Sequence, residues 1–303
     1  MKKVYVFGSI IMDNTTTCHH VPRDGESVFG NEYYVSYGGK GINQAMMIKN
    51  LDGDVTMIGA IGKDSNGQSF EDLLSSRGFD LTKIFKKDNI STGISNIIID
   101  CNGQNRIIVV PGANYLLTSE DILSIQDEIK DDSVFLISNE IPIKTIKTII
   151  DLGVKKKAFI ILNPAPYKDL DDETLNQVDI ITPNENEVSD LFKLDRYNEE
   201  SVIKGFDKLK TKCLIVTLGD KGSLYYDHQN IKHYSPYKVE VVDTVGAGDA
   251  YNGGLTFGLA NGIDMEDAIK LGTICASIAI TRKGALKAQP DMEEVKEFYN
   301  KNN

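Results

Sequence analysis

Residues 242–253 read VDTVGAGDAYNG, a pattern that predicts a turn leading into a helix. Gly246, Ala247 and Gly248 are small residues placed where this helix is expected to begin, near Ala247. The first amide groups of a helix have no partner within it, so these positions predict a hole for an anion. Asp249 follows in the first turn, where the helix dipole favours an ionised carboxylate. A base beside an anion hole suits phosphoryl transfer.

Two common phosphate-binding motifs do not account for this stretch. A dinucleotide fingerprint would need a third glycine where Tyr251 stands, and a Walker A loop would need Gly-Lys-Ser/Thr after the turn. Taken alone, the stretch would be interpreted as a glycine-rich helix start with an acidic first turn. However, DTVGAGDAY resembles the C-terminal signature of the ribokinase family of sugar kinases, the phosphofructokinase-B type.

A second motif lies near the N-terminus, where residues 37–45 read YGGKGINQA. Its glycines allow a ligand to approach the backbone closely, although a GGKG run alone is typical of a flexible turn. GGKGxNQA also resembles the N-terminal signature of the same family. The two signatures occur in the expected order, so the resemblance extends over nearly the whole chain.

Composition sets limits on the kind of protein and its partners. The chain has 303 residues, 41% of them hydrophobic, which suits a soluble globular protein with a sizeable core. The net charge of −11 opposes binding to nucleic acid or to an anionic membrane. No apolar run approaches the ~20 residues of a membrane span. Gly8 and Ser9 interrupt the N-terminal apolar run, so no signal peptide is predicted.

The cysteines indicate a reducing compartment. Their wide spacing predicts neither a zinc site nor a disulfide framework, so the cytoplasm is the expected location. They are Cys18, Cys101, Cys213 and Cys275. The adjacent His19 and His20 do not favour a metal site, because neighbouring side chains point in different directions.

Short apolar runs alternate with amphipathic stretches, which predicts an α/β fold with a doubly wound, Rossmann-like parallel sheet. The expected strands are 4–7, 55–61, 134–137, 159–162, 180–182 and 214–217. The expected helices are 68–77, 120–130, 143–152, 184–191 and 201–209. Ligands bind such sheets beyond the carboxyl ends of the strands. The polar residues expected at those ends are Asp13, Glu140, Asn163, Asn184 and Thr217.

Two segments do not have the composition of a core and are predicted to form a small β-sheet lid. They are residues 14–37, with a strand at 32–36, and residues 91–111, with a hairpin that turns at 102–103. The core domain then comprises residues 1–13, 38–90 and 112–303.

The family resemblance implies how the substrates are held. Asp249 would be the catalytic base, beside an anion hole formed by Gly246, Ala247 and Gly248. The implied sugar contacts are Asp13, Gly39, Lys40, Gly41, Asn43, Glu140 and Asp249. Ile11 departs from the family, whose ribose-using members typically carry Asn at this position. In an extended chain Ile11 and Asp13 share a face, so Ile11 is also predicted to face the sugar.

The resemblance also implies nucleotide and metal sites. Asn184 and Glu187 match an Asn-x-x-Glu motif that supports Mg²⁺ through water. The implied ATP contacts are Asn184, Thr217, Leu218, Gly219, Asp220, Lys221, Gly222, Gly248 and Thr273. TRKGA at 281–285 resembles a K⁺-binding loop. The implied K⁺ ligands are Asp243, Val245, Ala279, Arg282, Gly284 and Ala288, where relatives often carry a hydroxyl at the last position.

These features together predict an ATP-dependent kinase that phosphorylates the primary hydroxyl of a pentose, with ribose as the first candidate. A kinase for 2-deoxyribose, a nucleoside or a hexose is the alternative within the fold. A non-catalytic sugar or nucleotide sensor is the alternative outside this class. A homodimer through the lid is expected, because Ile97 and Ile99 share one strand face of a small sheet.

Overall fold

The computed structural model describes residues 1–302. The strands of its large sheet are β1 (Val4–Phe7), β4 (Val55–Gly62), β5 (Ile84–Lys87), β8 (Val134–Ser138), β9 (Phe159–Asn163), β10 (Ile180–Ile181), β11 (Cys213–Thr217), β12 (Ser223–Tyr226) and β13 (Ile231–Tyr234). The helices are α1 (Lys40–Asn50), α2 (Ser65–Ser76), α3 (Ser119–Ser124), α4 (Ile143–Lys155), α5 (Asp172–Leu175), α6 (Glu185–Leu191), α7 (Glu199–Phe206), α8 (Ala247–Ala260), α9 (Met265–Ala279) and α10 (Met292–Asn302).

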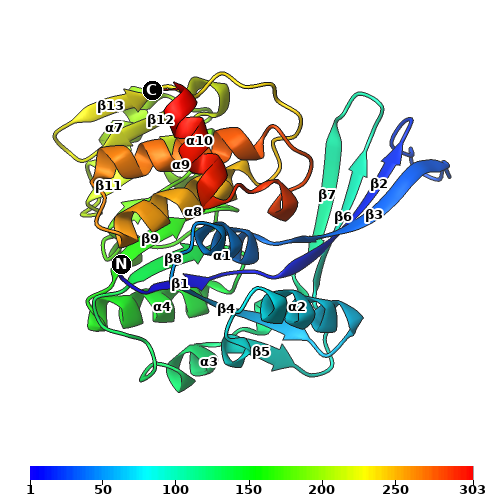
Figure 1. Cartoon of the computed structure of the whole chain (residues 1–303), viewed down its shortest axis with the longest axis horizontal. Coiled ribbons are helices and arrows are strands. Elements are labelled where there is room, and N and C mark those ends of the chain that lie inside the picture. The colour runs from blue at the N-terminus through cyan, green and yellow to red at the C-terminus, as the bar shows by residue number, and fades with distance from the viewer. Residues whose placement is uncertain (303) are drawn as a thin grey trace.

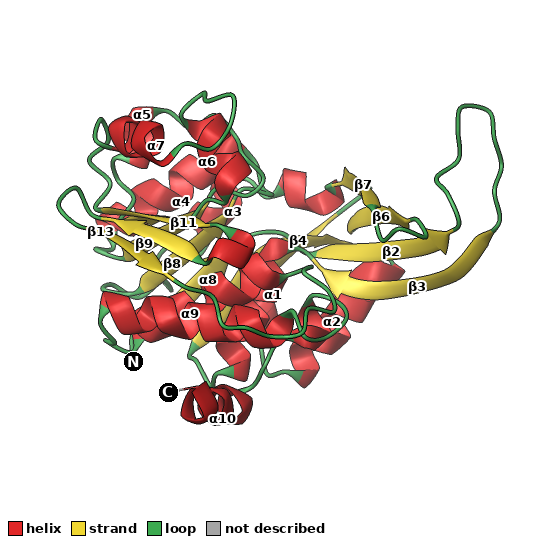
Figure 2. Ribbon diagram, turned by 90° about the horizontal axis from the view of Figure 1, so that it is seen from above, coloured by secondary structure: helices red, strands yellow, loops and turns green. Residues whose placement is uncertain are grey.

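The large sheet has the order β13-β12-β11-β10-β9-β8-β1-β4-β5 and lies between two layers of helices (Figures 1 and 2). The strands β11, β10, β9, β8, β1, β4 and β5 pair in parallel along this order, whereas β12 pairs antiparallel with both β11 and β13. Side chains alternate between the faces. Val4 and Val6 pack toward α1, α8 and α9, and Tyr5 and Phe7 pack toward α3 and α4. The predicted α/β class is therefore confirmed.

A separate small sheet consists of β2 (Ile11–Cys18), β3 (Gly30–Gly38), β6 (Gly93–Ile99) and β7 (Asn105–Val110), in the order β3-β2-β6-β7. It projects from the core (Figure 2). The sequence predicted β3 and the hairpin of β6 and β7 but missed β2, which begins before the expected boundary at residue 14. The run of threonines at 15–17 looked unlike core, yet β-branched residues favour strands.

The chain passes between the two sheets at one compact junction. Asn114 lies there fully buried, accepting a hydrogen bond from the amide of Ile10 at 2.9 Å and donating to its carbonyl at 2.8 Å. Asn114 also donates to the carbonyl of Pro111 at 2.9 Å. A Cβ on Gly93 would lie 2.4 Å from Asn114 Nδ2, so only glycine fits there. The junction thus brings together three segments of the chain. They are the connection from β1 to β2, the start of β6, and the segment between β7 and α3.

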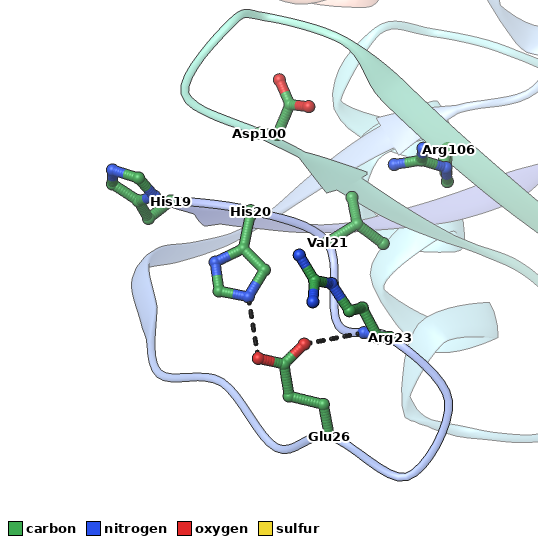
Figure 3. A pocket seen from close by; sticks show the side chains of 7 residues that line it. All are labelled: His19, His20, Val21, Arg23, Glu26, Asp100 and Arg106. Atoms are coloured by element: carbon green, nitrogen blue, oxygen red, sulfur yellow. Dashed lines mark hydrogen bonds and ion pairs between the residues drawn. The ribbon is translucent and has the colours of Figure 1, made fainter.

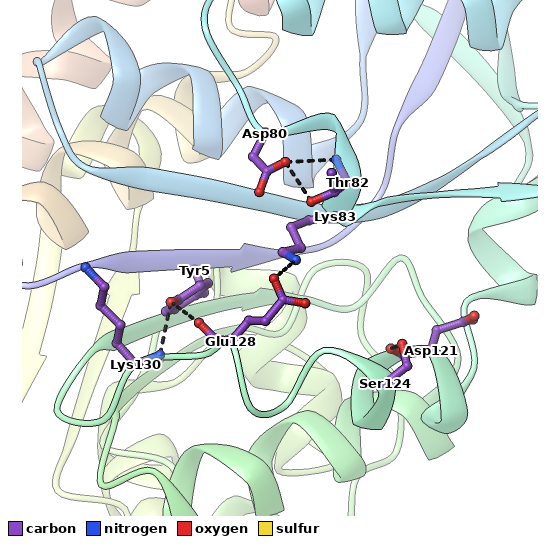
Figure 4. Close-up of polar contacts among 8 residues, drawn as sticks. All are labelled: Tyr5, Asp80, Thr82, Lys83, Asp121, Ser124, Glu128 and Lys130. Carbon is purple, nitrogen blue, oxygen red and sulfur yellow. Dashed lines mark hydrogen bonds and ion pairs between the residues drawn. The ribbon is translucent and has the colours of Figure 1, made fainter.

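The helix predicted at 120–130 ends early, at Ser124. Beyond it, backbone contacts hold the chain against β1: the amide of Lys130 donates to the hydroxyl of Tyr5 at 3.0 Å (Figure 4). Lys83 forms an ion pair with Glu128 in the same region. These tertiary contacts replace the helix that local periodicity predicted. Strands β5, β12 and β13 were also missed.

Helices α1 and α8 approach each other very closely. A Cβ on Gly253 of α8 would lie 2.5 Å from Cβ of Met47 on α1, and a Cβ on Gly41 would lie 2.5 Å from the backbone of Gly8. No larger residue fits at either position without displacing a neighbour. As a result, the N-terminal ends of both helices meet beyond the carboxyl ends of the strands.

Candidate active site

Asp249 lies in the first turn of α8 and is 6% exposed. Its carboxylate accepts hydrogen bonds from two side chains of α1, Asn43 Nδ2 at 2.9 Å and Gln44 Nε2 at 3.1 Å. The two helices that carry the family signatures are therefore joined at the predicted base.

The surroundings of Asp249 raise the pKa of its carboxyl group. Burial raises its pKa to about 6. The positive charge of Lys40 and the hydrogen bonds from Asn43 and Gln44 oppose this rise, and the carboxylate of Glu140 adds to it. Such a pKa places Asp249 in the range where a carboxyl group can exchange protons near neutral pH.

The backbone beside Asp249 provides open donors. Gly246 has φ 77°, a left-handed conformation that favours glycine. Within residues 1–302 the amides of Gly246, Gly248 and Asp249 have no hydrogen-bond acceptor, whereas the amide of Ala247 donates to the carbonyl of Thr244 at 3.2 Å. Of the three amides predicted to form the anion hole, those of Gly246 and Gly248 are therefore open and that of Ala247 is not. The amide of Asp249 is open as well.

At the start of α1, the ammonium group of Lys40 and the carboxylate of Glu140 both lie near Asp249. Gly39 has φ 100°, and a Cβ there would lie 2.8 Å from the carbonyl of Ser9, so glycine is required on both grounds. Glu140 accepts hydrogen bonds from the amide of Lys40 at 3.0 Å and from the hydroxyl of Ser9. Burial lowers the pKa of Lys40, but the carboxylates of Asp249, Glu140 and Glu187 outweigh burial and raise it. Lys40 is accordingly a fixed positive charge.

Asp13 and Ile11 lie on β2 of the small sheet, rather than at the end of β1 as expected. The Ser95 hydroxyl on β6 donates to Asp13. Burial raises the pKa of Asp13, the hydrogen bond from Ser95 opposes this, and Glu140 contributes to the rise. Ile11 is 4% exposed, but unlike Ile10 and Met12 it belongs to neither hydrophobic core cluster. Its position two residues from Asp13 in one strand agrees with the expected shared face.

Asn184 and Glu187 form the start of α6. Asn184 Oδ1 accepts from the amides of Asn186 and Glu187, and Glu187 Oε2 accepts from the amide of Asn184, all at 2.9 Å. Burial raises the pKa of Glu187, and Lys40 opposes this rise. Glu187 Oε1 has no partner within residues 1–302 and could accept hydrogen bonds from a hydrated Mg²⁺. The described residues hold no cluster of three acidic, His or Cys side chains for direct coordination.

The predicted ATP segment follows β11 as a tight turn. The amide of Thr217 donates to the carbonyl of Pro183 at 2.9 Å, which places this turn beside the start of α6. Gly219 has φ 58° and open space around it, whereas a Cβ on Gly222 would lie 1.9 Å from the carbonyl of Tyr234. Leu218 is buried, and Asp220 and Lys221 are exposed. Thr273 lies on α9 with its hydroxyl bonded to the carbonyl of Ile269.

The predicted K⁺ loop joins two segments through Asp243. Its carboxylate accepts from the amide of Val245 at 3.0 Å and from that of Gly284 at 2.9 Å. Within residues 1–302, the implied ligand carbonyls that accept no hydrogen bond are those of Asp243, Val245, Arg282, Gly284 and Ala288. The carbonyl of Ala279 accepts from the amide of Arg282 at 3.2 Å. Free carbonyl oxygens suit a monovalent cation.

Gln44 was missed as a functional residue, although the GGKGINQA motif contains it. Asn43 and Gln44 are consecutive on a helix, where neighbouring side chains diverge, so a shared partner was not expected. A pocket of about 520 Å³ at the outer end of the small sheet holds none of the predicted site residues (Figure 3). It is lined by His19, His20, Val21, Arg23, Glu26, Asp100 and Arg106.

Comparisons with known proteins agree with this geometry. A family model described as pfkB family carbohydrate kinase matches residues 1–292. The chain belongs to the pfkB family. It is 35% identical to a ribokinase of Lactococcus lactis, over 98% of this chain and 96% of that protein. It is 30% identical to a deoxyribokinase of Salmonella typhimurium, over 99% of both chains.

Among solved structures, an Arabidopsis thaliana ribokinase complexed with ribose and ATP matches with a TM-score of 0.88 and 26% identity, over 98% of both chains. Membership of the pfkB family makes this protein a sugar kinase and does not favour the alternative of a non-catalytic sensor. No helix in the described part of the chain has the length and hydropathy of a membrane-spanning segment.

The raised pKa of Asp249 predicts a pH-dependent stability. The value is about 6 in the folded protein against 3.8 in a model peptide. Asp249 therefore favours folding fully below pH 4, and this contribution is lost as the pH rises through 6. Asp249→Asn removes the dependence, so its free energy of unfolding should gain roughly 2.5 kcal/mol relative to wild type between pH 4 and pH 8. Urea denaturation at both pH values measures the gain.

Asp24→Asn is the matched control, because Asp24 is an exposed loop residue. Its free energy of unfolding should differ from wild type by the same amount at both pH values. An equal difference for Asp249→Asn at pH 4 and pH 8 would contradict the raised pKa.

Proposed function

We propose that this protein transfers the γ-phosphate of ATP to the primary hydroxyl of a pentose, with D-ribose as its substrate. The observation that carries the proposal is a buried carboxylate, Asp249, beside amides that have no acceptor in the described part of the chain. The likeness to ribokinases, one of them complexed with ribose and ATP, supports it.

In the proposed mechanism Asp249 accepts the proton of the sugar hydroxyl as the hydroxyl oxygen bonds to the γ-phosphorus. The bond between that phosphorus and the oxygen of the β-phosphate breaks, and ADP leaves. A positioned base of this kind contributes ~10²–10⁴-fold in rate. The amides of Gly246, Gly248 and Asp249 stabilise charge on the transferring group, where the loss of one donor costs about 3–4 kcal/mol. Lys40 supplies further positive charge at the same place.

Residues from the small sheet and from the core hold the sugar in this proposal. Asp13 comes from the small sheet, and Asn43 and Glu140 come from the core. Asn43 Oδ1 is buried without a partner in the described chain, so a sugar hydroxyl can donate to it while Nδ2 stays on Asp249. The implied contacts of Gly39, Lys40 and Gly41 complete the set. Closure of the small sheet would exclude water and limit ATP hydrolysis.

Two cations are part of the proposal. Asn184 and Glu187 would hold a water-shelled Mg²⁺, which neutralises phosphate charge. ATP would lie along Thr217–Gly222, with Gly248 and Thr273 near it. K⁺ would sit among the free carbonyls beside Asp243 and fix the turn that carries the open amides.

Asp249→Asn tests the proposed base. The amide keeps the shape of the carboxylate and lacks its basicity, so kcat should fall at least ~100-fold while ATP affinity changes little. Coupled ADP release with ribose measures kcat, and calorimetric titration measures ATP binding. A kcat near that of wild type would overturn the assignment of Asp249 as the base.

Replacement of K⁺ by a large organic cation tests the cation site. We expect kcat to fall with no change in the folded fraction, because free carbonyls of the 281–285 loop would lose their partner. Circular dichroism in each salt provides the folding control. Equal rates in both salts would remove K⁺ from the mechanism.

A second candidate substrate is 2-deoxyribose, because an apolar side chain lies beside Asp13. Ile11 is buried outside both hydrophobic clusters and cannot hydrogen-bond a hydroxyl. A sugar hydroxyl desolvated against it would lose roughly 1–3 kcal/mol, whereas a CH₂ group would pack well. The likeness to a deoxyribokinase also fits this candidate.

Ile11→Asn tests whether Ile11 sets the preference between the two sugars. Wild type should accept 2-deoxyribose well, and the variant should shift the kcat/KM ratio toward ribose by about 10-fold or more. Ile231→Asn, the same change at an exposed position of the edge strand β13, is the control. If wild type prefers ribose by more than ~100-fold and Ile11→Asn leaves the ratio unchanged, Ile11 has no role in specificity.

We also propose a homodimer through the small sheet. Its edge strands expose Tyr34 and Ile107, which are 46% and 51% accessible and lie on the same face as the half-buried Ile97 and Ile99. Ile107→Lys should convert the dimer to a monomer, because a charge would enter an apolar contact. Sedimentation at micromolar concentration measures both forms, and a monomeric wild type would count against the proposal.

A further inference from the structure

The carboxylate of Asp249 is the end of a line of buried polar groups that leads into the core. Gln44 Nε2 donates to Asp249 Oδ1 and to Asn163 Oδ1, each at 3.1 Å. Asn163 Nδ2 donates to the backbone carbonyl of Thr182 at 3.0 Å. Every member of this line is less than 9% exposed.

A second line starts from the hydroxyl of the same threonine. Thr182 Oγ1 donates to Asn252 Oδ1 at 2.6 Å, and Asn252 Nδ2 donates to the carbonyl of Gly248 at 2.8 Å. That carbonyl and the amide of Asp249 belong to one planar peptide unit. Holding the carbonyl therefore fixes the direction of the Asp249 amide, which has no acceptor among residues 1–302.

Donor and acceptor chemistry gives these lines a direction. A backbone carbonyl can only accept, so the carbonyl of Thr182 requires the nitrogen of Asn163 to face it. The oxygen of Asn163 then faces Gln44 and requires the nitrogen of Gln44. The second proton of that nitrogen is left pointing at Asp249. Turning the Gln44 amide over would set its oxygen against both Asn163 Oδ1 and the carboxylate.

We propose that Thr182 anchors an orientation relay in which Gln44 and Asn163 hold the Asp249 carboxylate while Asn252 holds the Gly248–Asp249 peptide. Thr182, Gln44, Asn163 and Asn252 are positioning residues in this relay. Its catalytic consequence rests on the proposed function, whereas its effect on the protonation of Asp249 does not.

The first line acts on the protonation of Asp249. A donor to the ionised form lowers the pKa of a carboxyl group, so the Gln44 hydrogen bond opposes the effect of burial. The charged groups that face Asp249 are Lys40 of α1 and Glu140 beyond β8, and its other donor is Asn43. Substitutions in the relay leave these three groups in place.

Gln44→Leu tests the first line, because it removes the donor at nearly constant volume. The apparent pKa in the pH profile of kcat should rise by about one unit, which makes kcat roughly tenfold lower below pH 6 with a smaller difference at pH 8. A purely structural defect would lower kcat equally at every pH. Gln289→Leu is the matched control: Gln289 is also buried against α1, but within the described residues its side chain donates only to the carbonyl of Asn43.

Thr182→Val tests the second line alone, since it removes the hydroxyl and keeps the backbone carbonyl. We expect kcat to fall about tenfold at every pH with no shift of the apparent pKa and little change in KM. Thr182→Ser restores the hydroxyl and should restore kcat. Equal kcat for the Val and Ser variants would overturn the second line.

Carbon-13 NMR titration of the Asp249 carboxyl separates the relay from the proposed function. If wild type phosphorylates no pentose, the proposed function fails, and the titration of wild type and Gln44→Leu still decides the first line. An unshifted pKa in Gln44→Leu would overturn it. If Gln44→Leu does not fold, Gln44→Met, which also lacks the donor, takes its place in both measurements.

Discussion

The contact between α1 and α8 supports everything else in the site, since it brings two donors of one helix onto a carboxylate of the other. Packing alone would not stabilise the carboxylate of Asp249 at so buried a position, because burial raises the free energy of its charged form. Asn43 and Gln44 offset that penalty through hydrogen bonds to both oxygens. Glycines at the crossing, above all Gly253, let the helices come near enough for these bonds to form. The close packing of α1 against α8 is therefore also what stabilises the charge of Asp249.

The electrostatics of the surrounding residues follow from that contact. Lys40 stands among three carboxylates, those of Asp249, Glu140 and Glu187, and its charge is retained although it is largely withdrawn from water. Glu140 in turn holds the start of α1 through the amide of Lys40. The net charge of −11 makes such local compensation necessary for a phosphate ligand, because the protein as a whole repels anions.

Much of the fold could be predicted because parallel strands in a buried sheet are continuous apolar runs bounded by turns. Runs such as Val134–Ser138 and Cys213–Thr217 are of this kind, and both are strands in the structure. β2 was missed because its threonines carry no apolar periodicity. The helix expected at 120–130 was overestimated because Ile125 and Ile129 have helical spacing, while their burial serves tertiary contacts instead. Local pattern cannot distinguish these outcomes.

The candidate site also contains residues that the sequence revealed and residues that it did not. Positions fixed by backbone conformation, such as Gly39 and Gly246, leave a trace in the sequence because few residues tolerate positive φ. Side chains that act at a distance in sequence leave none: Gln44 meets Asn163 and Asp249 only because three separate segments converge. Ala247 lies in the predicted anion hole, yet its amide is used within the turn, a distinction that depends on a single hydrogen bond.

The junction at Asn114 has a consequence for how the small sheet moves. Its strands come from separate stretches of sequence, and independent connections would let each strand fray by itself. The side chain of Asn114 instead hydrogen-bonds to both Ile10 and Pro111, and it packs against Gly93. Because one side chain links the connections of β2, β6 and β7, we expect the small sheet to open as one unit and its interstrand amide protons to exchange with solvent together.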